Sequence, residues 1–227
     1  MIRFCDIMFS LLAIVALLPL FLLVVLVLLF TGEGEVFFIQ RRVGRNGKHF
    51  GILKFATMLK NSPNMGSGTI TINGDPRILP VGQILRRTKI NELPQLWNVF
   101  IGDMSLIGPR PQTHECFDAF TKVAKQKLVT LRPGLSGVGS IIFRSEEKML
   151  SASSINENTE IYRRKIMRYK GEVEAWYVDN KSLSFYFLLI VLTAWYVVNP
   201  RSDAIYSCIK SLPKPPPDLI YLIRSTS

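Results

Sequence analysis

Residues 11–30 read LLAIVALLPLFLLVVLVLLF, a run of twenty residues without one charged or hydrogen-bonding side chain. A helix of that length rises about 30 Å, which matches the hydrocarbon thickness of a bilayer. No small-residue cleavage site follows the run, as a secretory signal peptide would require. The stretch therefore predicts a membrane segment that stays attached to the chain after it.

Pro19 lies near the middle of this apolar run. Proline lacks a backbone N–H and clashes with the preceding turn, so it kinks or breaks a helix. In one topology a kinked helix spans the bilayer. In the other the helix breaks at Pro19 and returns to the face it entered. Arg3 precedes the run and Arg41 follows it, so the flanking charges leave both topologies open.

The 227-residue chain carries a formal charge of +11, and most of it follows the apolar run directly. Residues 36–110 hold eleven Lys or Arg and three acids, a net charge of +8, whereas residues 1–35 have a net charge of −2. Such a field attracts phosphate groups, anionic lipids or nucleic acid. A nucleic-acid site would interleave aromatic with basic side chains, but the apolar residues of 75–111 are mainly aliphatic. We expect a phosphate-handling region at a membrane, with no nucleic acid partner.

Cysteines and histidines are too few and too scattered for two further classes of protein. Cys5, Cys116 and Cys208 are widely spaced and form neither a metal motif nor a disulfide framework. His49 and His114 have no partners at ligand spacing. We expect no zinc site and a reducing, cytoplasmic setting for the soluble region.

The soluble region predicts short, mixed elements. Residues 36–39 suggest a strand, and residues 61–76 an irregular loop. Asn91 is a good N-cap for a helix that would end at Gly102. Further helices are expected over 114–129 and 159–178, a buried or interfacial helix over 185–198, and an extended, mobile tail from Leu212.

Four strings resemble one family, the bacterial sugar transferases known as monotopic polyprenyl-phosphate phosphoglycosyl transferases. The longest, DPRILPVGQILRRTKINELPQLWNVFIGDMSLIGPRP at 75–111, is highly specific. The others are VFFIQRRVGRNGKHFGILKFATM (36–58), LRPGLSG (131–137) and WYVDNKS (176–182). The resemblance covers roughly residues 1–200.

The resemblance implies a reaction. A sugar-1-phosphate moves from a UDP-sugar to a polyprenyl phosphate such as undecaprenyl phosphate, with Mg²⁺ as cofactor. UMP leaves, and the membrane-bound product starts the assembly of a surface glycan. The expected partners are the UDP-sugar donor, the polyprenyl phosphate acceptor and membrane lipids.

The resemblance also implies an architecture. The N-terminal helix is expected to be re-entrant, broken at Pro19, with both ends at the cytoplasmic face of a bacterial inner membrane. The expected fold class is α+β, a monotopic membrane protein with interfacial helices and a small cytoplasmic domain of few short strands. The expected division is a re-entrant helix at 1–35, a catalytic domain at 36–200 and a tail at 201–227.

The family's active site centres on an Asp-Glu pair before the LPQL string, and here that pair is Asn91-Glu92. An amide oxygen can bind Mg²⁺ but is a very poor nucleophile. We expect Glu92 to supply the essential carboxylate, either as the nucleophile or as a metal ligand for direct transfer. Asn91 would then orient a phosphate oxygen or the metal. Ala56 replaces a basic residue of the family's pattern, so one cation and one anion are absent together.

Five further residues match the family's strings and are candidates for phosphate binding. Arg110 lies between two prolines that stiffen its backbone, and a guanidinium can hold a phosphate through two parallel hydrogen bonds. The others are Lys54, Arg132, Arg42 and Gln40. The replaced Asp leaves a second hypothesis open, a catalytically silent relative that binds nucleotide sugar or organises other glycan enzymes.

Overall fold

The computed structural model describes residues 1–66, 68, 70–150, 154–200, 202–217, 219–220 and 223. Helices dominate, and the strands are few and short, which confirms the predicted mixture of helix and sheet. The strands are β1 (Phe37–Val43), β2 (His49–Phe55), β3 (Ser105–Ile107) and β4 (Gly134–Ser136). The helices are α1 (Ile2–Leu29), α2 (Pro80–Arg87), α3 (Gln95–Ile101), α4 (His114–Asp118), α5 (Lys122–Leu128), α6 (Val138–Ile142), α7 (Glu146–Met149), α8 (Ile155–Ile161), α9 (Met167–Asn180), α10 (Leu183–Val198) and α11 (Ala204–Cys208).

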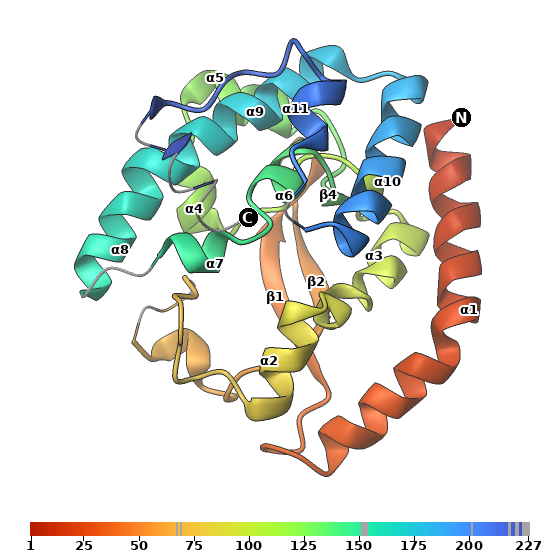
Figure 1. Ribbon diagram of the computed structural model, residues 1–227. Coiled ribbons are helices and arrows are strands. Elements are labelled where there is room, and N and C mark those ends of the chain that lie inside the picture. The colour runs from red at the N-terminus through yellow and green to blue at the C-terminus, as the bar shows by residue number, and fades with distance from the viewer. Residues whose placement is uncertain are drawn as a thin grey trace.

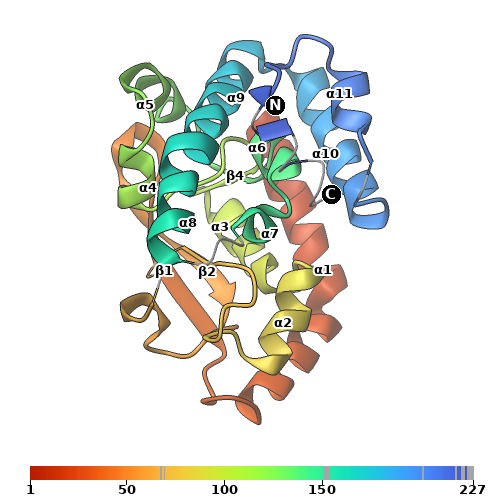
Figure 2. The same ribbon diagram turned by 60° about the vertical axis from the view of Figure 1, so that its left-hand side comes forward.

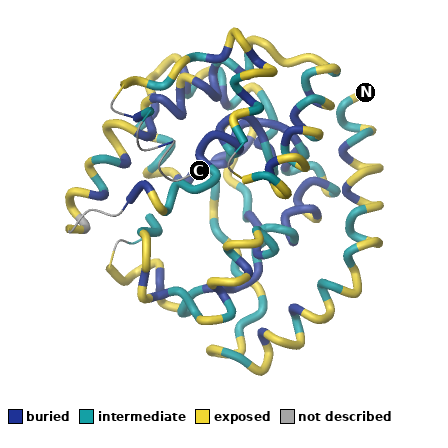
Figure 3. Tube along the Cα trace, in the orientation of Figure 1, coloured by how far each residue is buried: buried dark blue, intermediate teal, exposed yellow. Residues whose placement is uncertain are grey.

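Helix α1 contains the whole apolar run and continues through Pro19. It bends part-way along its length (Figure 1), as a proline inside a helix requires. Within the described residues it is the one helix long and apolar enough to cross a membrane. Its outer side is exposed (Figure 3), with Leu12 61% and Val15 65% accessible. Such an apolar surface suits lipid rather than water.

The first turns of α1 are fixed to the body of the protein by polar contacts. Arg3 donates to the carbonyl oxygens of Val99 and Phe100 at the end of α3, at 2.5 and 2.7 Å. Both carbonyls lie in the last turn of α3, where no following helical turn supplies N–H donors, although the Val99 oxygen also accepts the Gly102 N–H at 3.2 Å. Asp6 is 1% exposed, and its Oδ1 accepts hydrogen bonds from Ser105, Leu106 and Tyr186.

The last turns of α1 pack against the same body through apolar contacts. Val24 and Leu28 are buried with Phe55 of β2 and Leu85 of α2. Phe55 also meets Phe21 at a ring-centroid distance of 5.6 Å. Both ends of α1 are therefore attached to one compact unit, although 28 helical residues span about 42 Å if straight.

Two small sheets hold the centre of the soluble region. Strands β1 and β2 form an antiparallel hairpin, with Gln40 opposite Ile52. In Figure 1 this hairpin runs between α1 and α8. Strands β3 and β4 pair in parallel, with Ser105 opposite Gly134 and Ile107 opposite Ser136. Strand β1 is longer than the four residues predicted from sequence.

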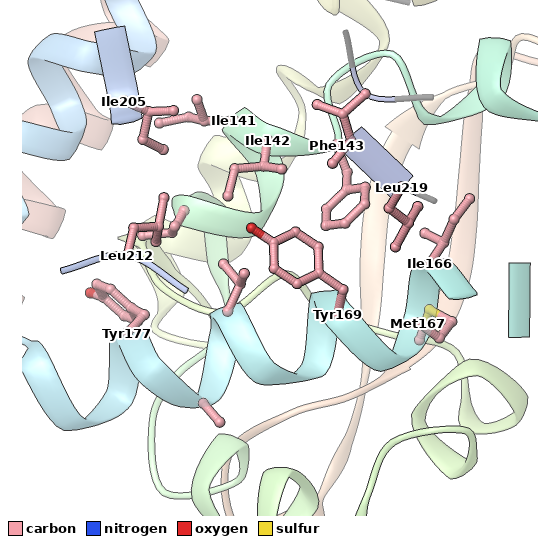
Figure 4. Packing of buried hydrophobic residues seen from close by; sticks show 14 of the residues in the cluster. Ile141, Ile142, Phe143, Ile166, Met167, Tyr169, Tyr177, Ile205, Leu212 and Leu219 are labelled. Carbon is pink, nitrogen blue, oxygen red and sulfur yellow. The ribbon is translucent and has the colours of Figure 1, made fainter. Parts of the chain in front are cut away.

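The main hydrophobic core forms around α9, and the C-terminal segment contributes to it. Leu212 and Leu219 are 5% and 1% exposed and pack among the residues of this core (Figure 4). The hydroxyl of Tyr169 donates to the carbonyl oxygen of Pro213 at 2.7 Å. The predicted extended, mobile tail is therefore wrong for the described residues, because its leucines gain more from burial than from solvation.

Helix α10 has one buried face, which confirms the predicted core contacts, and one exposed apolar face, for which the predicted interfacial position stays a prediction. Tyr186, Leu189 and Leu192 are in the core, whereas Val191 and Trp195 are 64% and 49% exposed. Figure 2 shows α10 beside α11, where the Tyr196 hydroxyl accepts from the Ile205 N–H.

Two predicted helix boundaries are wrong. Asn91 does not cap a helix; it lies buried inside the short 3₁₀ helix Ile90–Glu92, and α3 begins only at Gln95 after Pro94. The predicted end at Gly102 is confirmed, with a left-handed φ of 100°. The helix expected over 114–129 is divided into α4 and α5, because the Thr121 side chain caps a new helix.

Replacing Asp6 by Ala should destabilise the protein, because three donors lose their buried acceptor. At about 1 kcal/mol or more for each, the free energy of unfolding should fall by about 3 kcal/mol. Thermal melting in detergent measures the change. Leu12→Ala, an exposed position on the same helix, is the control and should melt like the parent. Equal melting of both variants would contradict this account of the attachment.

Candidate active site

A pocket of about 610 Å³ opens between the β1–β2 hairpin, the 3₁₀ helix Ile90–Glu92 and helices α6, α7 and α9. It brings together most residues selected from sequence: Gln40, Arg42, Lys54, Asn91, Glu92 and Arg110. Arg132 is not part of its lining. Its Nε donates instead to the carbonyl oxygen of Gly102 at 2.8 Å, which is a structural contact.

Glu92 is clasped by two cations from separate parts of the chain. Its Oε1 lies 2.7 Å from a terminal nitrogen of Arg110 and 3.2 Å from Nζ of Lys54. The second guanidinium nitrogen lies 3.4 Å from Oε2. Burial alone would raise the pKa of this carboxyl, but Arg110 and Lys54 hold it well below its usual range. Glu92 is therefore an anion at neutral pH.

Cations outnumber anions around Glu92. Burial lowers the pKa of Lys54 to about 8, and Arg110 and Arg42 act in the same direction against the attraction of Glu92. The Glu92 carboxylate raises the pKa of Arg110. The centre thus keeps a positive excess even with Glu92 ionised, which favours binding of a polyanion such as a diphosphate.

Arg110 is positioned by a close contact between two loops. A Cβ at Gly134 would lie 2.1 Å from the Gly108 nitrogen, and one at Gly137 would lie 2.2 Å from the Gly108 oxygen. Only glycine permits such an approach. The GPRP and RPGLSG strings quoted above therefore lie directly against each other, and this contact directs Arg110 into the pocket.

Glu174 fixes the backbone of Arg110 by accepting its N–H. Its Oε1 accepts the Arg110 N–H at 3.0 Å, and its Oε2 has no partner in the described residues. Gly139 allows this approach, since a Cβ there would lie 2.3 Å from Oε1. Glu174 is 1% exposed, and burial raises its pKa to about 7 despite that hydrogen bond. It positions Arg110 and does not line the pocket.

Gln40 and Arg42 reach the pocket from alternate positions of β1. The Arg42 guanidinium donates to Oε1 of Gln40 at 2.5 Å and to the Pro111 carbonyl at 3.3 Å. Its Nε is buried with no partner among the described residues. Burial and the charge of Arg110 lower the pKa of Arg42. Buried donors are normally paired, so the Arg42 Nε leaves room for one more acceptor.

Asn91 carries an oxygen that nothing in the described structure satisfies. The residue is 6% exposed, lines the pocket beside Glu92, and its Oδ1 accepts no hydrogen bond there. Mg²⁺ binds through one or two protein oxygens and completes its shell with water and phosphate oxygens. The Asn91 amide oxygen and the Glu92 carboxylate could supply these one or two protein ligands. No group of three His, Cys, Asp or Glu suited to a metal occurs in the described residues.

A second group of charges lines the pocket and was missed by the sequence analysis. Glu146 of α7 accepts both of its contacts from Lys170 of α9 at 2.9 Å, and Arg86 pairs with Glu147. Lys89 and Arg144 also line the pocket. Residues 144–170 carry many charges of both signs, so the sequence alone does not distinguish these from surface residues.

The DPR string of residues 75–77 is structural rather than catalytic. Arg77 is 4% exposed and pairs with Asp75 at 2.5 Å. It also donates to the carbonyl oxygens of Ser62 and Met65. One guanidinium therefore holds the irregular loop predicted over 61–76, and the described residues of this stretch confirm the loop, with only the short 3₁₀ helix Ser62–Asn64 within it.

Comparison with known proteins identifies the family. The bacterial sugar transferase family matches residues 1–200, so the chain belongs to that family. It is 36% identical over 158 residues to the exopolysaccharide production protein ExoY of Sinorhizobium fredii (strain NBRC 101917 / NGR234), covering 63% of this chain and 70% of the relative.

Two other relatives carry the name of a reaction. One is the UDP-N-acetylgalactosamine-undecaprenyl-phosphate N-acetylgalactosaminephosphotransferase of Aeromonas hydrophila, 37% identical over 142 residues. The other is the undecaprenyl-phosphate glucose phosphotransferase of Komagataeibacter xylinus, 36% identical over 149 residues. The matches cover 62% and 61% of this chain but only 33% and 27% of these longer relatives.

Stability should depend on pH through Glu174. Its folded pKa, about 7, exceeds the unfolded value near 4.3, so the folded state holds the proton in between. The stabilising contribution is complete below about pH 4 and is lost as pH rises through 7, by a few kcal/mol in total. Glu174→Gln should lack this loss, so its stability relative to the parent should increase from pH 5 to pH 8. Parallel melting curves of the two proteins across that range would refute the assignment.

Proposed function

We propose that this chain transfers a sugar-1-phosphate from a UDP-sugar to a polyprenyl phosphate, with undecaprenyl phosphate as the expected acceptor. The product would start the assembly of a membrane-bound glycan. One observation carries the proposal: an ionised carboxylate, Glu92, lies clasped by Arg110 and Lys54 in a positively charged pocket. The named relatives act on N-acetylgalactosamine and glucose, so the donor sugar stays open.

The pocket adjoins the apolar surface on which a lipid acceptor would lie. Phe55 lines the pocket and also packs against Phe21 and Leu28 of α1. Phe37 stacks on Phe55 at 5.6 Å and is itself 47% exposed. An apolar path therefore leads from the membrane helix to the charged centre. A polyprenyl chain could follow this path with its phosphate at the cations.

Glu92 is the residue to which we assign the chemistry. In a two-step transfer its carboxylate would attack the phosphorus that carries the sugar, and the bond to the bridging oxygen would break. The nucleoside monophosphate would leave, and a polyprenyl phosphate oxygen would then displace Glu92 from the same phosphorus. Arg110 and Lys54 would neutralise charge on the phosphoryl oxygens throughout. In direct transfer Glu92 would instead bind the metal.

We further propose Mg²⁺ as the cofactor, held by Asn91 Oδ1 and Glu92 together with oxygens of the substrate. When bound it would neutralise diphosphate charge and polarise the phosphorus–oxygen bond. Asn91 would also turn its amide toward a phosphate oxygen. Gln40 and Arg42 would hold the far side of the phosphate group.

The expected topology is re-entrant, with α1 entering and leaving at the cytoplasmic face of the inner membrane. Arg3 and Asp6 at one end, and Val24 and Leu28 at the other, contact the same body. A helix across the bilayer would place these groups on opposite sides, separated by about 30 Å of hydrocarbon. The exposed face of α10 would lie at the interface, with Trp195 among the headgroups.

Proteolysis in oriented vesicles tests the topology. A cleavable tag before Met1 should be lost in inside-out vesicles together with the soluble region, and both should be protected in right-side-out vesicles. If α1 spanned the bilayer, the tag and the soluble region would lie on opposite sides. Each kind of vesicle would then protect one of the two and leave the other open to cleavage. A tag after Ser227 provides the internal standard for orientation.

Glu92→Gln tests the function. We would measure UMP release with undecaprenyl phosphate, Mg²⁺ and a panel of UDP-sugars, and expect a loss of at least about a hundred-fold. Glu172→Gln, an exposed glutamate on α9, is the matched control and should keep full activity. Arg110 and Lys54 lose their counter-charge in Glu92→Gln, which could destabilise the fold. Melting curves are therefore needed to show that the variant is folded.

The outcomes separate the competing hypotheses. Stoichiometric UMP release without lipid indicates a covalent intermediate, and its loss in Glu92→Gln would assign that intermediate to Glu92. Full activity of Glu92→Gln with its usual metal would exclude Glu92 as the essential carboxylate. No release with any donor favours the silent relative, a hypothesis that Asn91 supports because its amide cannot act as a nucleophile. Asn91→Asp would then show whether restoring a carboxylate restores turnover.

A further inference from the structure

Lys89 has a backbone conformation that lysine rarely adopts. Its φ is 62° and its ψ is 11°, in the left-handed region. Asn46 is the other non-glycine residue with positive φ in the described structure. Glycine adopts this conformation without steric cost, and asparagine tolerates it, whereas a lysine is strained there. Residues strained in this way cluster at active sites and ligand-binding positions, which makes Lys89 a candidate for a functional role.

The backbone role of Lys89 does not require its side chain. Its N–H donates to the Arg86 oxygen at 3.1 Å, and its oxygen accepts from the Glu92 N–H at 3.1 Å. These bonds turn the chain from α2 into the 3₁₀ helix that carries Asn91 and Glu92. A glycine would make the same two hydrogen bonds with less strain. Turn formation alone therefore does not explain a lysine at this position.

The Lys89 side chain is partly buried in the pocket wall without an anionic partner. It lines the pocket, and no hydrogen bond or ion pair joins its ammonium to any described residue. The charges that act on it belong to two ion pairs, Glu92 with Arg110 and Glu147 with Arg86. Lys89 therefore lies between the charges around Glu92 and those around Glu147.

Most other cations of the pocket wall already have a carboxylate. Lys54 and Arg110 share Glu92, Arg86 holds Glu147, and Lys170 holds Glu146. A desolvated ammonium without a counter-ion costs free energy in the free protein. A ligand that supplies the anion would offset this cost.

We propose that Lys89 binds a phosphate of the nucleoside diphosphate group of the donor. This inference rests on the proposed function and extends it to a residue that determines donor affinity. Lys89 would hold the phosphate next to the one held by Arg110 and Lys54, on the side of Arg86 and α7. A diphosphate would then bridge the two groups of charges that line the pocket.

Uridine diphosphate, which has no sugar to transfer, tests the inference by binding alone. Titration calorimetry with Mg²⁺ would compare the parent with Lys89→Gly, Lys89→Met and Lys89→Arg. Removing the ammonium should weaken binding by about ten-fold or more, because a hydrogen bond between charged groups is lost. Lys89→Arg should stay within a few-fold of the parent.

Stability distinguishes a binding residue from a structural one. Lys89→Gly should melt at the same temperature as the parent or higher, because the left-handed backbone is relaxed. Asn46→Gly makes the same backbone change at an exposed site outside the pocket, and should leave nucleotide binding unchanged. Lys89→Met keeps the backbone restraint and removes only the charge.

Equal affinity of the parent and Lys89→Met would overturn the inference, as would a parent that does not bind uridine diphosphate. Loss of affinity in Lys89→Gly alone would also overturn it, because backbone flexibility would then be the cause. A parent that binds the nucleotide through Lys89 but releases no UMP from any UDP-sugar would keep the inference and contradict the proposed transferase activity. The two failures are therefore separable.

Discussion

The ion pair between Glu92 and Arg110 is the contact on which the pocket depends. It joins the 3₁₀ helix after α2 to the rigid loop after β3, two segments that share no strand or helix. Lys54 joins from the hairpin, so one carboxylate ties together three separate parts of the chain. Because the cations exceed the anions there, the free pocket keeps a positive excess, to which the proposed function assigns an anionic ligand.

The surrounding elements restrain the backbone of Arg110. Parallel pairing of β3 with β4 brings Gly108 against Gly134, and no side chain fits between them. Glu174 holds the Arg110 N–H through an oxygen that Gly139 leaves room for. Both contacts act on the Arg110 backbone, and a fixed backbone suits the guanidinium for the phosphate binding that we propose, which needs fixed geometry.

The sequence predicted correctly those elements that depend on residues close together in the chain. The apolar run gave α1, the residues before Arg41 gave the start of β1, and Gly102 gave the end of α3. The wrong predictions needed contacts that are distant in sequence: Asn91 is a good cap in isolation, yet it is buried inside a 3₁₀ turn. The tail looked mobile because its prolines favour extended backbone, whereas the burial of its leucines depends on contacts with the distant α9. The same holds for the site, where Arg132 matched a motif but contacts Gly102, while Glu146 and Lys170 matched none.

The two attachments of α1 differ in kind, and the difference bears on how the helix sits in a membrane. The first turn is held by Arg3 and Asp6 through hydrogen bonds, which need precise geometry and a partner in the soluble body. The last turns are held by apolar contacts with Phe55, which are not directional. Between them exposed apolar side chains such as Leu12 and Val15 form a surface that suits lipid rather than water. In the proposed topology the polar attachment fixes the depth of the helix at one end, while the apolar one keeps the opposite end beside the pocket to which we assign the acceptor phosphate.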